Sequence, residues 1–585
     1  MKKLLVYLKD YKKETICAPL FKMLEATFEL FVPLVVASLI DKGIGNRDHK
    51  YVLCMCGIMV ALGIIGLVCS ITAQYFAAKA AVGFATKLRH ALFAHIQSLS
   101  YTEMDQVGTA TLITRMTSDI NQTQSGVNMV LRLFLRSPFI VFGAMIMAFT
   151  VDVKAALIFV VAIPLLSVVV FSIILLSIPM YKKVQSLLDH VLGITRENLT
   201  GVRVIRAFRL EEKEVERFRG GNEALKKMQL FVGRFSALMN PITYVIVNGA
   251  TAVLIWYGAI RVDNGYITQG AVVALVNYMA QILVELVKLA NLIVTITKAV
   301  ACANRIESVF EIQSTIKEKD GSICEVERNS ASPAKEKETT VVTFQNVSLT
   351  YAGAGAESLT DIQFTVKRGE TIGVIGGTGS GKTSLVNLIP RFYDVTKGAV
   401  LVDGKDVREY RLEELRDKIG VVPQKAVLFK GTIRDNMKWG REDATDEEIW
   451  QALEIAQAKE FVEKKDGKLD AAVSQNGKNF SGGQRQRLTI ARALVRKPEI
   501  LILDDSASAL DYLTDANLRR AISKMEEIGA VFIVSQRTSS IQNADRIIVL
   551  DDGCIAGIGT HEELLEKCEV YQEIYESQYK DGKRA

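Results

Sequence analysis

Residues 376–383 read Gly376-Gly377-Thr378-Gly379-Ser380-Gly381-Lys382-Thr383, with Ser384 next, and they decide the fold of the chain's second half. The apolar run Thr371 to Ile375 before them has the composition of a buried strand, and a helix is predicted to begin near Lys382. Glycines at this spacing let backbone N–H groups converge on phosphate oxygens, and the N-terminus of the following helix adds a favourable dipole. We expect Lys382 to reach the terminal phosphates and Thr383 to ligate magnesium. The stretch predicts a site for ATP and Mg²⁺.

A second apolar strand, Ile500 to Leu503, ends in the carboxylate of Asp504. In a central parallel strand, an acid at the C-terminal end lies near the phosphates and can hold magnesium through water. The alternative is an aspartate that only caps the following turn. Because the glycine loop is present, the magnesium role is favoured.

Strand-like runs alternate with helical ones throughout the second half, which is typical of an α/β domain. The predicted strands include Val341 to Phe344, Thr371 to Ile375, Ile500 to Leu503, Val531 to Val534 and Arg546 to Leu550.

The first half of the chain contains six apolar windows, each long enough to cross a bilayer as a helix. One window could be a buried core helix, but six in succession favour a membrane domain. The windows are Ile16 to Ile40, Tyr51 to Ala78, Met129 to Val151, Ala155 to Met180, Phe235 to Ile260 and Asn264 to Val284.

The predicted organisation is therefore an all-α transmembrane domain of six helices at 1–312, a linker at 313–340, and an α/β nucleotide-binding domain at 341–585. The linker is rich in charges and serine and has little periodicity.

The loops predict the orientation in the membrane. The segments after the second and fourth windows are long and basic, whereas those near Asp41, Asp152 and Asp263 are short. The positive-inside rule then places the N-terminus, both long loops and the C-terminal half in the cytoplasm of a multi-pass membrane protein. The charged residues that follow Met1-Lys2-Lys3 argue against a removable signal peptide.

Composition adds three expectations. The net charge of +6 over 585 residues is small and gives no reason to expect a nucleic-acid partner. The mean hydropathy of +0.20 fits one very apolar half joined to one soluble half. The eight cysteines are scattered, several of them inside apolar windows, so we expect free thiols.

Further along, residues 479–484 read Asn479-Phe480-Ser481-Gly482-Gly483-Gln484. This motif resembles the signature of ATP-binding cassette (ABC) proteins. With the glycine loop and the six windows, nearly the whole chain resembles a half-transporter of the multidrug and lipid exporter type. Shorter matches are Tyr351, Gln424, Ser508 to Asp511, Gly559 to Leu564, and two cytoplasmic coupling loops at Gly108 to Asp119 and Gly201 to Phe208.

The resemblance implies a role for each matched residue. Tyr351 would stack on adenine, Gln424 would link magnesium to the membrane domain, and Asp511 would lie in the loop that crosses to a partner domain. In the family, two nucleotide domains close head to tail on two ATP molecules. Ser481, Gly482 and Gly483, with Gln484 completing the motif, would therefore touch the γ-phosphate of ATP held by the partner chain.

Two residues depart from the family pattern. Asp505 stands where a glutamate polarises the attacking water, and Gln536 stands where a histidine contacts the γ-phosphate. The aspartate is one methylene shorter, which withdraws the carboxylate by about 1 Å, and a misplacement of that size can lower a rate on the order of a hundredfold. A glutamine can hydrogen-bond phosphate but carries no proton near neutral pH. We predict a site that binds ATP well and hydrolyses it poorly.

This pattern resembles the degenerate-site subunit of heterodimeric bacterial exporters. A second, different half-transporter would then supply the glutamate and the histidine, and the cargo would be an amphipathic small molecule such as a drug, lipid or peptide. A homodimer with slow hydrolysis and a nucleotide-gated channel or sensor are the alternatives. An importer fits less well, because importers of this superfamily usually have separate membrane chains.

The sequence leaves open the role of the charges in the first window and just after the last one. Glu25 and Glu29 lie one helical turn apart, as do Glu285 and Lys288. Such charges either line a water-filled cavity or satisfy one another.

Overall fold

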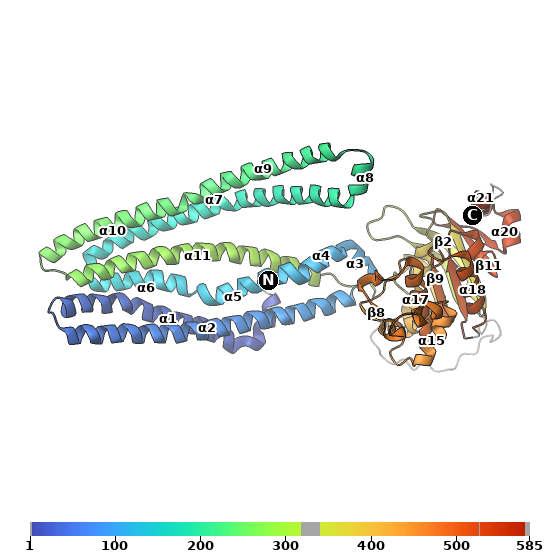
Figure 1. Cartoon of the computed structure of the whole chain (residues 1–585), viewed down its shortest axis with the longest axis horizontal. Coiled ribbons are helices and arrows are strands. Elements are labelled where there is room, and N and C mark those ends of the chain that lie inside the picture. The colour runs from blue at the N-terminus through green and yellow to red at the C-terminus, as the bar shows by residue number, and fades with distance from the viewer. Residues whose placement is uncertain (1–2, 317–339, 526, 580–585) are drawn as a thin grey trace. The chain divides into compact units, whose positions relative to one another are not determined.

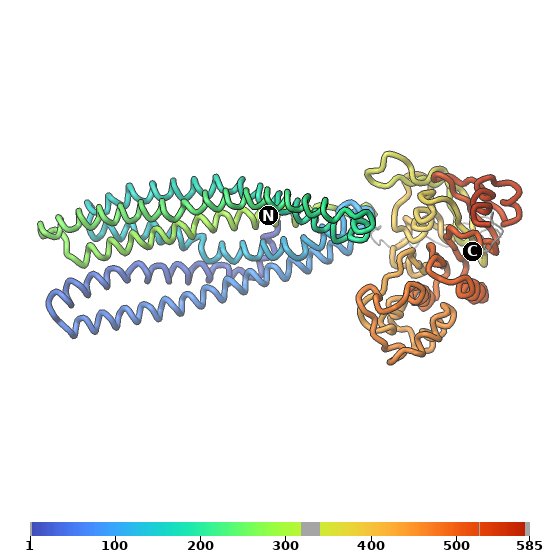
Figure 2. Tube along the Cα trace, turned by 45° about the horizontal axis from the view of Figure 1, so that its top comes forward, coloured from blue at the N-terminus to red at the C-terminus, as the bar shows by residue number. Residues whose placement is uncertain are grey.

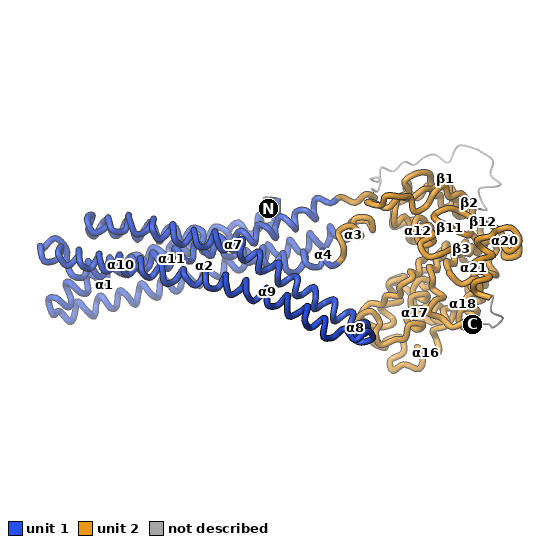
Figure 3. The backbone as a smooth tube through the Cα atoms, turned by 90° about the horizontal axis from the view of Figure 1, so that it is seen from above, with its two compact units in different colours: residues 1–97, 110–312 blue, residues 98–109, 313–585 orange. Residues whose placement is uncertain are grey.

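The computed structural model describes residues 3–316, 340–525 and 527–579. The chain divides into two compact units, shown in Figure 3. Unit 1 comprises Met1–Gln97 and Ala110–Ile312, and unit 2 comprises Ser98–Thr109 and Gln313–Ala585. Most of the predicted linker, residues 317–339, lies outside the described residues.

Within the described residues, six helical stretches are long and apolar enough to cross a membrane, which confirms the predicted number. They contain 42 to 53 residues, about twice the ~20 that a bilayer requires, so the helices continue beyond it. The stretches are Lys3–Ile44, His49–Ser98, Thr109–Val151, Val153–Thr200, Glu211–Asp263 and Gln269–Phe310.

The long helices of unit 1 run side by side, and α7 and α9 extend together to a turn at α8 (Figures 1 and 2). The helices are α1 Lys12–Ser38, α2 His49–Ser98, α4 Thr109–Thr114, α5 Ile120–Leu133, α6 Arg136–Val151, α7 Val153–Thr200, α8 Val202–Ala207, α9 Glu211–Ala237, α10 Met239–Asp263 and α11 Gln269–Phe310. A 3₁₀ helix covers Lys3–Tyr11, and π-helical turns cover Leu39–Ile44 and Arg115–Asp119.

Acids in the short turns fix the helix ends of unit 1. Asp41 accepts a hydrogen bond from the backbone N–H of Gly270 at 2.7 Å, at the start of α11. Asp152 caps α7 by accepting from the backbone N–H of Ala155 at 2.8 Å, and it also pairs with Arg261 of α10.

Unit 2 is built on a six-stranded sheet with the order β12-β11-β3-β10-β9-β6, in which only β12 is antiparallel to its neighbour. Its central strands are buried along their whole length, which explains their continuous apolar sequences. The strands are β3 Glu370–Gly376, β6 Ile419–Val422, β9 Ile500–Asp504, β10 Ala530–Val534, β11 Arg546–Asp551 and β12 Cys554–Gly559.

A second, antiparallel sheet has the order β2-β1-β4-β5. Its strands are β1 Thr340–Leu349, β2 Leu359–Lys367, β4 Lys397–Val402 and β5 Lys405–Asp406, and the short pair β7 Gly431–Thr432 and β8 Ala472–Val473 stands apart. All five strands predicted from the sequence are confirmed.

The helices of unit 2 are α3 Tyr101–Val107, α12 Lys382–Asn387, α13 Leu412–Asp417, α14 Ile433–Lys438, α15 Asp446–Ile455, α16 Lys459–Glu463, α17 Gly482–Val495, α18 Tyr512–Ile522, α19 Thr538–Ile541, α20 His561–Lys567 and α21 Glu569–Tyr579. Some of them, such as α17 and α21, contact the six-stranded sheet, and others, such as α15, contact neighbouring helices. Short 3₁₀ turns cover Val407–Glu409, Lys468–Asp470 and Gln475–Gly477. The seven cysteines among the described residues are free, as predicted.

The segment Ser98–Thr109, which overlaps the start of the predicted first coupling loop, belongs to unit 2. Helix α3 belongs to unit 2, where the Tyr101 ring packs on Phe392 at 4.8 Å and Tyr393 donates to Asp105 at 2.8 Å. The predicted coupling loop, Gly108 to Asp119, begins in unit 2 and continues in unit 1. Asp119 there is buried and pairs with Arg305 of α11, which holds it in the helical bundle.

Candidate nucleotide site

The predicted site residues follow the carboxyl ends of neighbouring parallel strands. Val534 of β10 lies opposite Val374 of β3 on one side and opposite Asp504 of β9 on the other. Parallel strands end at the same edge of a sheet, and ligands of open α/β sheets bind outside that edge. The glycine loop begins at the last residue of β3. Asp504 ends β9, and Asp505 follows it directly. Gln536 follows β10, and Gln424 follows β6.

A cavity of about 340 Å³ opens at this edge. It brings together Tyr351, Thr378, Gly379, Gly381, Lys382, Thr383, Ser384, Gln424, Asp504, Asp505 and Gln536. It also includes Ser358, Val534 and Ser535, which the sequence analysis did not single out.

The glycine loop is shaped by its neighbours. A Cβ at Gly376 would lie 2.2 Å from the carbonyl oxygen of Leu550, and Gly381 has φ +94 and would place a Cβ 2.7 Å from Leu359. At Gly377 and Gly379 an added Cβ would meet nothing within 4 Å. The loop is therefore packed on one side and open on the other, as a phosphate cradle requires.

Lys382 is directed at its own loop. Its Nζ donates to the carbonyl oxygens of Gly376 at 2.9 Å and Gly377 at 2.6 Å. Burial lowers the pKa of Lys382, and the charges of Asp505 and Asp504 oppose that shift. A phosphate would give this buried ammonium an anionic partner.

Thr383 and Asp504 lie together across the cavity. The Thr383 hydroxyl donates to Asp504 at 3.0 Å, and the Asp504 side chain is almost fully buried. Burial raises the pKa of the Asp504 carboxyl, since it disfavours the charged form, and the nearby charge of Asp505 adds to this shift. Hard oxygen donors beside a phosphate cradle fit Mg²⁺, which Thr383 and Asp504 would hold together with Gln424, which follows the adjacent strand β6. Bound Mg²⁺ neutralises charge on the phosphates.

The two departing residues lie at the mouth of the cavity. Gln424 Nε2 donates to Asp505 Oδ2 at 3.3 Å, and Asp505 has a left-handed backbone with φ +46. The side chain of Gln536 is exposed. Neither residue is embedded in packing that would hold it against the phosphates.

One residue that positions Gln536 was missed. Gln578, on α21, donates from Nε2 to the carbonyl oxygen of Gln536 at 2.8 Å. Its Oε1 accepts from the backbone N–H of Thr538 at 3.0 Å and from the Thr538 hydroxyl at 2.9 Å. Helix α21 thereby holds the segment that carries Gln536 through hydrogen bonds. Because the contact joins residues far apart in the sequence, it has no local sequence signal.

Tyr351 lies at the edge of the cavity. Its hydroxyl hydrogen-bonds Ser384 at 2.8 Å, and its ring makes an edge contact with Tyr393 at 5.0 Å. These contacts hold an aromatic ring beside the start of α12.

The signature forms the start of α17 and does not line this cavity. The Ser481 hydroxyl oxygen accepts from the backbone N–H of Gln484, and Gln484 Oε1 accepts from the N–H of Ser481. Ser481 and Gly482 are exposed, and Gly483 is half-buried. Asp511 is likewise exposed, and it caps α18 by accepting from the N–H of Thr514 at 3.1 Å.

Most of the charges whose role the sequence leaves open belong to a network across three helices. Glu285 of α11 accepts from Arg136 of α6 at 2.6 Å, from Ser137 at 2.9 Å and from Lys288 at 2.8 Å. Arg136 also donates to Glu29 of α1 at 2.6 Å.

Both alternatives for these charges, pairing with one another and lining a cavity, are therefore partly confirmed. Glu285 and Lys288 pair with each other, and with Glu29 they also line a cavity of about 390 Å³. Glu25 differs from them, because it pairs with Lys22 on its own helix.

Comparison with known proteins agrees with this arrangement. Residues 15–286 match the family model described as ABC transporter transmembrane region, and residues 359–508 match the model described as ABC transporter. An uncharacterized ABC transporter ATP-binding protein of Mycobacterium tuberculosis is 37% identical, covering 98% of this chain and 97% of its own. The chain belongs to the ABC transporter family.

Further relatives show the exporter class. An ATP-dependent lipid A-core flippase of Desulfotalea psychrophila is 32% identical over 93% of each chain, and a putative multidrug export ATP-binding/permease protein of Bacillus subtilis is 33% identical over 99% of this chain and 98% of its own. The fold matches that of a bacterial Atm1-family ABC exporter with ATP bound, with a TM-score of 0.78 at 23% identity over 97% of this chain and 99% of that one. This ABC chain is a half-transporter of the exporter type, an ATPase coupled to transport, with its nucleotide-binding unit in the cytoplasm.

Proposed function

We propose that this ABC exporter chain works with a second, different half-transporter and holds the degenerate ATP site of the pair. One observation carries the proposal. The cavity keeps the phosphate and magnesium residues Lys382, Thr383 and Asp504, but presents Asp505 and Gln536 where the family has glutamate and histidine. This site retains ATP and hydrolyses it slowly.

The exposed signature supports the second half of the proposal. The Ser481 hydroxyl uses a lone pair to accept from Gln484, so its hydrogen is free to donate to another group. Phosphate held by a partner chain would be that group. An intact signature completes the partner's site, where the hydrolysis of the pair takes place.

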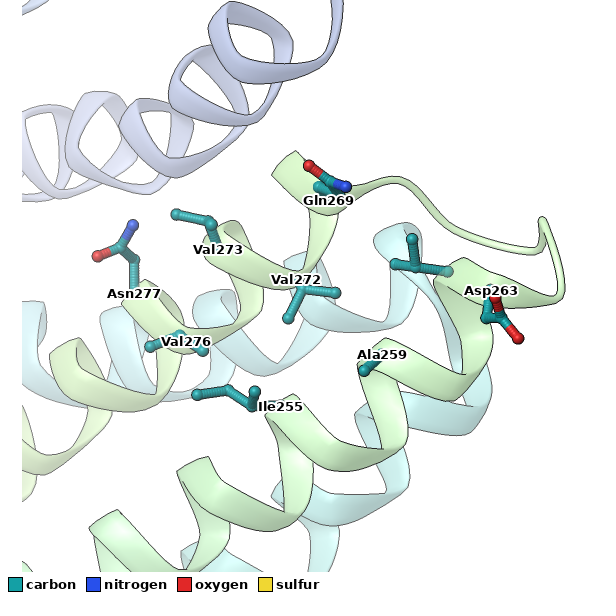
Figure 4. Close-up of a pocket in the computed structure, with 9 residues that line it drawn as sticks. Ile255, Ala259, Asp263, Gln269, Val272, Val273, Val276 and Asn277 are labelled. Carbon is teal, nitrogen blue, oxygen red and sulfur yellow. The ribbon is translucent and has the colours of Figure 1, made fainter. Parts of the chain in front are cut away.

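An amphipathic cargo is supported by the membrane unit and by the relatives. Figure 4 shows a pocket of about 590 Å³ between α10 and α11, lined mainly by valine, isoleucine and alanine. Such a pocket suits an apolar chain. The names of two relatives point to their cargo, which is a lipid for one and multidrug compounds for the other.

The proposed pairing predicts that this chain alone binds ATP but has little ATPase activity. The purified chain should bind ATP through Tyr351, Lys382 and Thr383, which line one cavity. A complex with the half-transporter encoded in a neighbouring reading frame, one that carries the glutamate and the histidine, should release phosphate far faster. Phosphate release by both preparations measures this. Equal turnover by the isolated chain would instead support a slow homodimer, and ATP binding without turnover in every pairing would support a nucleotide-gated module.

The degenerate site predicts unequal effects of matched substitutions in the complex. Asp505→Asn should lower phosphate release only modestly, because this acid is already a poor general base. Glutamate to glutamine at the equivalent position of the partner should nearly abolish it. A loss on the order of a hundredfold from Asp505→Asn would show that this chain's own site carries the hydrolysis.

A further inference from the structure

We propose that the cavity between α1, α6 and α11 selects amphiphiles with a zwitterionic headgroup, with Glu29 contacting the cationic part and Lys288 the anionic part. The cavity is called the head cavity here and is defined by Glu29, Gln281, Glu285 and Lys288. The inference rests on the proposed export of amphiphiles and names their chemical class.

The centre of the network is a buried ion pair. The side chains of Arg136 and Glu285 are 7% and 3% exposed, and they are joined at 2.6 Å. Ser137 satisfies the second oxygen of Glu285. This pair therefore links α6 and α11, and of its charged groups only Arg136 Nε lacks a hydrogen-bond partner among the described residues.

The flanking charges differ from that pair. The side chain of Glu29 is 42% exposed and that of Lys288 is 43% exposed. Among the described residues, Glu29 bonds through one oxygen to Arg136, and Lys288 bonds only to Glu285. A carboxylate accepts more than one hydrogen bond and an ammonium donates three, so both groups keep capacity for a ligand.

The two flanking charges have opposite signs and face one cavity of about 390 Å³. A purely cationic headgroup beside Glu29 would meet the repulsion of Lys288, and an anionic one beside Lys288 would meet that of Glu29. Charge interactions are stronger away from bulk water, and both charges lie on helices long and apolar enough to cross a membrane, so the mismatch matters. A zwitterion places one charge on each and leaves the site neutral.

An unpartnered acceptor supports the orientation. The side-chain oxygen of Gln281 is buried and has no hydrogen-bond partner among the described residues. Gln281 lies one helical turn before Glu285 and also lines the head cavity. A ligand N–H or O–H would donate to this oxygen. An ammonium or alcohol headgroup therefore fits the site better than a bare apolar chain does.

A tail pocket continues along the same face of α11. The residues that line the pocket of Figure 4 include Val273 and Asn277, and Asn277 also lines the head cavity. From Gln269 to Lys288 the lining positions recur every three or four residues, which places them on one helix face over about 29 Å. The headgroup and the acyl tail of one molecule can therefore contact α11 together.

The test compares four amphiphiles that share one fluorescent acyl tail and differ in the headgroup: phosphoethanolamine, primary ammonium, sulfate and glycerol. Binding is measured with the full complex in nanodiscs. The phosphoethanolamine compound should bind roughly tenfold tighter than the other three, as one hydrogen bond to a charged group would give. Glu29→Gln should remove its advantage over the sulfate compound, and Lys288→Gln its advantage over the primary ammonium compound.

Glu25→Gln is the matched control, because Glu25 lies on the same helix but pairs with Lys22 and is outside the head cavity. It should leave the order of the four affinities unchanged. Equal binding of all four compounds, or equal effects of Glu25→Gln and Glu29→Gln, would overturn the headgroup inference alone. Failure of every compound to bind would contradict the amphipathic cargo itself, whatever the ATPase assays show.

Discussion

Gly482→Asp in this chain should nearly abolish phosphate release by the complex. Gly482 is the exposed first residue of α17, and an added Cβ meets nothing within 4 Å in the chain. An acid at a helix N-terminus is favourable, so the variant should fold normally. The loss comes from a negative charge beside the phosphate held by the partner. Removing one donor at such a site typically lowers the rate by about a hundredfold to a thousandfold, or ~3 kcal/mol, and added repulsion should lower it further.

Two further variants test the same assignment of the signature to the partner's site. Ser481→Ala should act in the same direction but less strongly, because it removes the donor and a helix cap without adding charge. Lys382→Ala should do the reverse, emptying this chain's own site while some hydrolysis continues in the partner's. Bound nucleotide and released phosphate are measured for each variant in the same complex. Normal phosphate release by Gly482→Asp would mean that this signature does not complete the competent site.

Arg136→Met should strongly destabilise the membrane unit. The substitution leaves Glu285 buried with only Ser137 and Lys288 as partners, and it frees Glu29. Removing one member of a buried ion pair typically lowers the free energy of unfolding by about 3–5 kcal/mol. Thermal unfolding of the purified chain in detergent should show a lower midpoint. Combining Arg136→Met with Glu285→Met should recover most of the loss, because no buried charge then lacks a partner.

Arg217→Met is the control for this experiment. Arg217 pairs with Glu197 and Glu214, but its side chain is 49% exposed. Surface pairs of this kind contribute roughly 0–1 kcal/mol, so the midpoint should barely move. Similar midpoints for Arg136→Met and Arg217→Met would show that the network of Arg136 does not stabilise the fold.

The sequence was sufficient wherever the determining interaction is local. A glycine loop between an apolar strand and a helix, or an uninterrupted apolar window, carries its own signal, and both were predicted correctly. The strand ends that form the cavity follow from the same rule, because parallel strands share one carboxyl edge.

What the sequence did not show depends on contacts between distant segments. Glu285 and Lys288 are visible as a helical pair, but their link to Arg136 on α6 is a product of packing. Gln578 reaches the Gln536 segment from the C-terminal helix. The aromatic contact of Tyr101 with Phe392 likewise has no periodic signature in the sequence.

The backbone of Asp505 has an evolutionary consequence. Its φ of +46 lies in the left-handed region, which aspartate and asparagine enter more readily than other side chains. Aspartate is thus the acid that this turn tolerates best, while glutamate would bring a better placed carboxylate at a greater conformational cost. In the pair proposed above, a partner chain provides hydrolysis, so selection for a longer acidic side chain would be relaxed at this position while selection for stability would remain. Loss of the glutamate would then be hard to reverse, and duplicated half-transporters would drift apart into one chain that retains ATP and one that hydrolyses it.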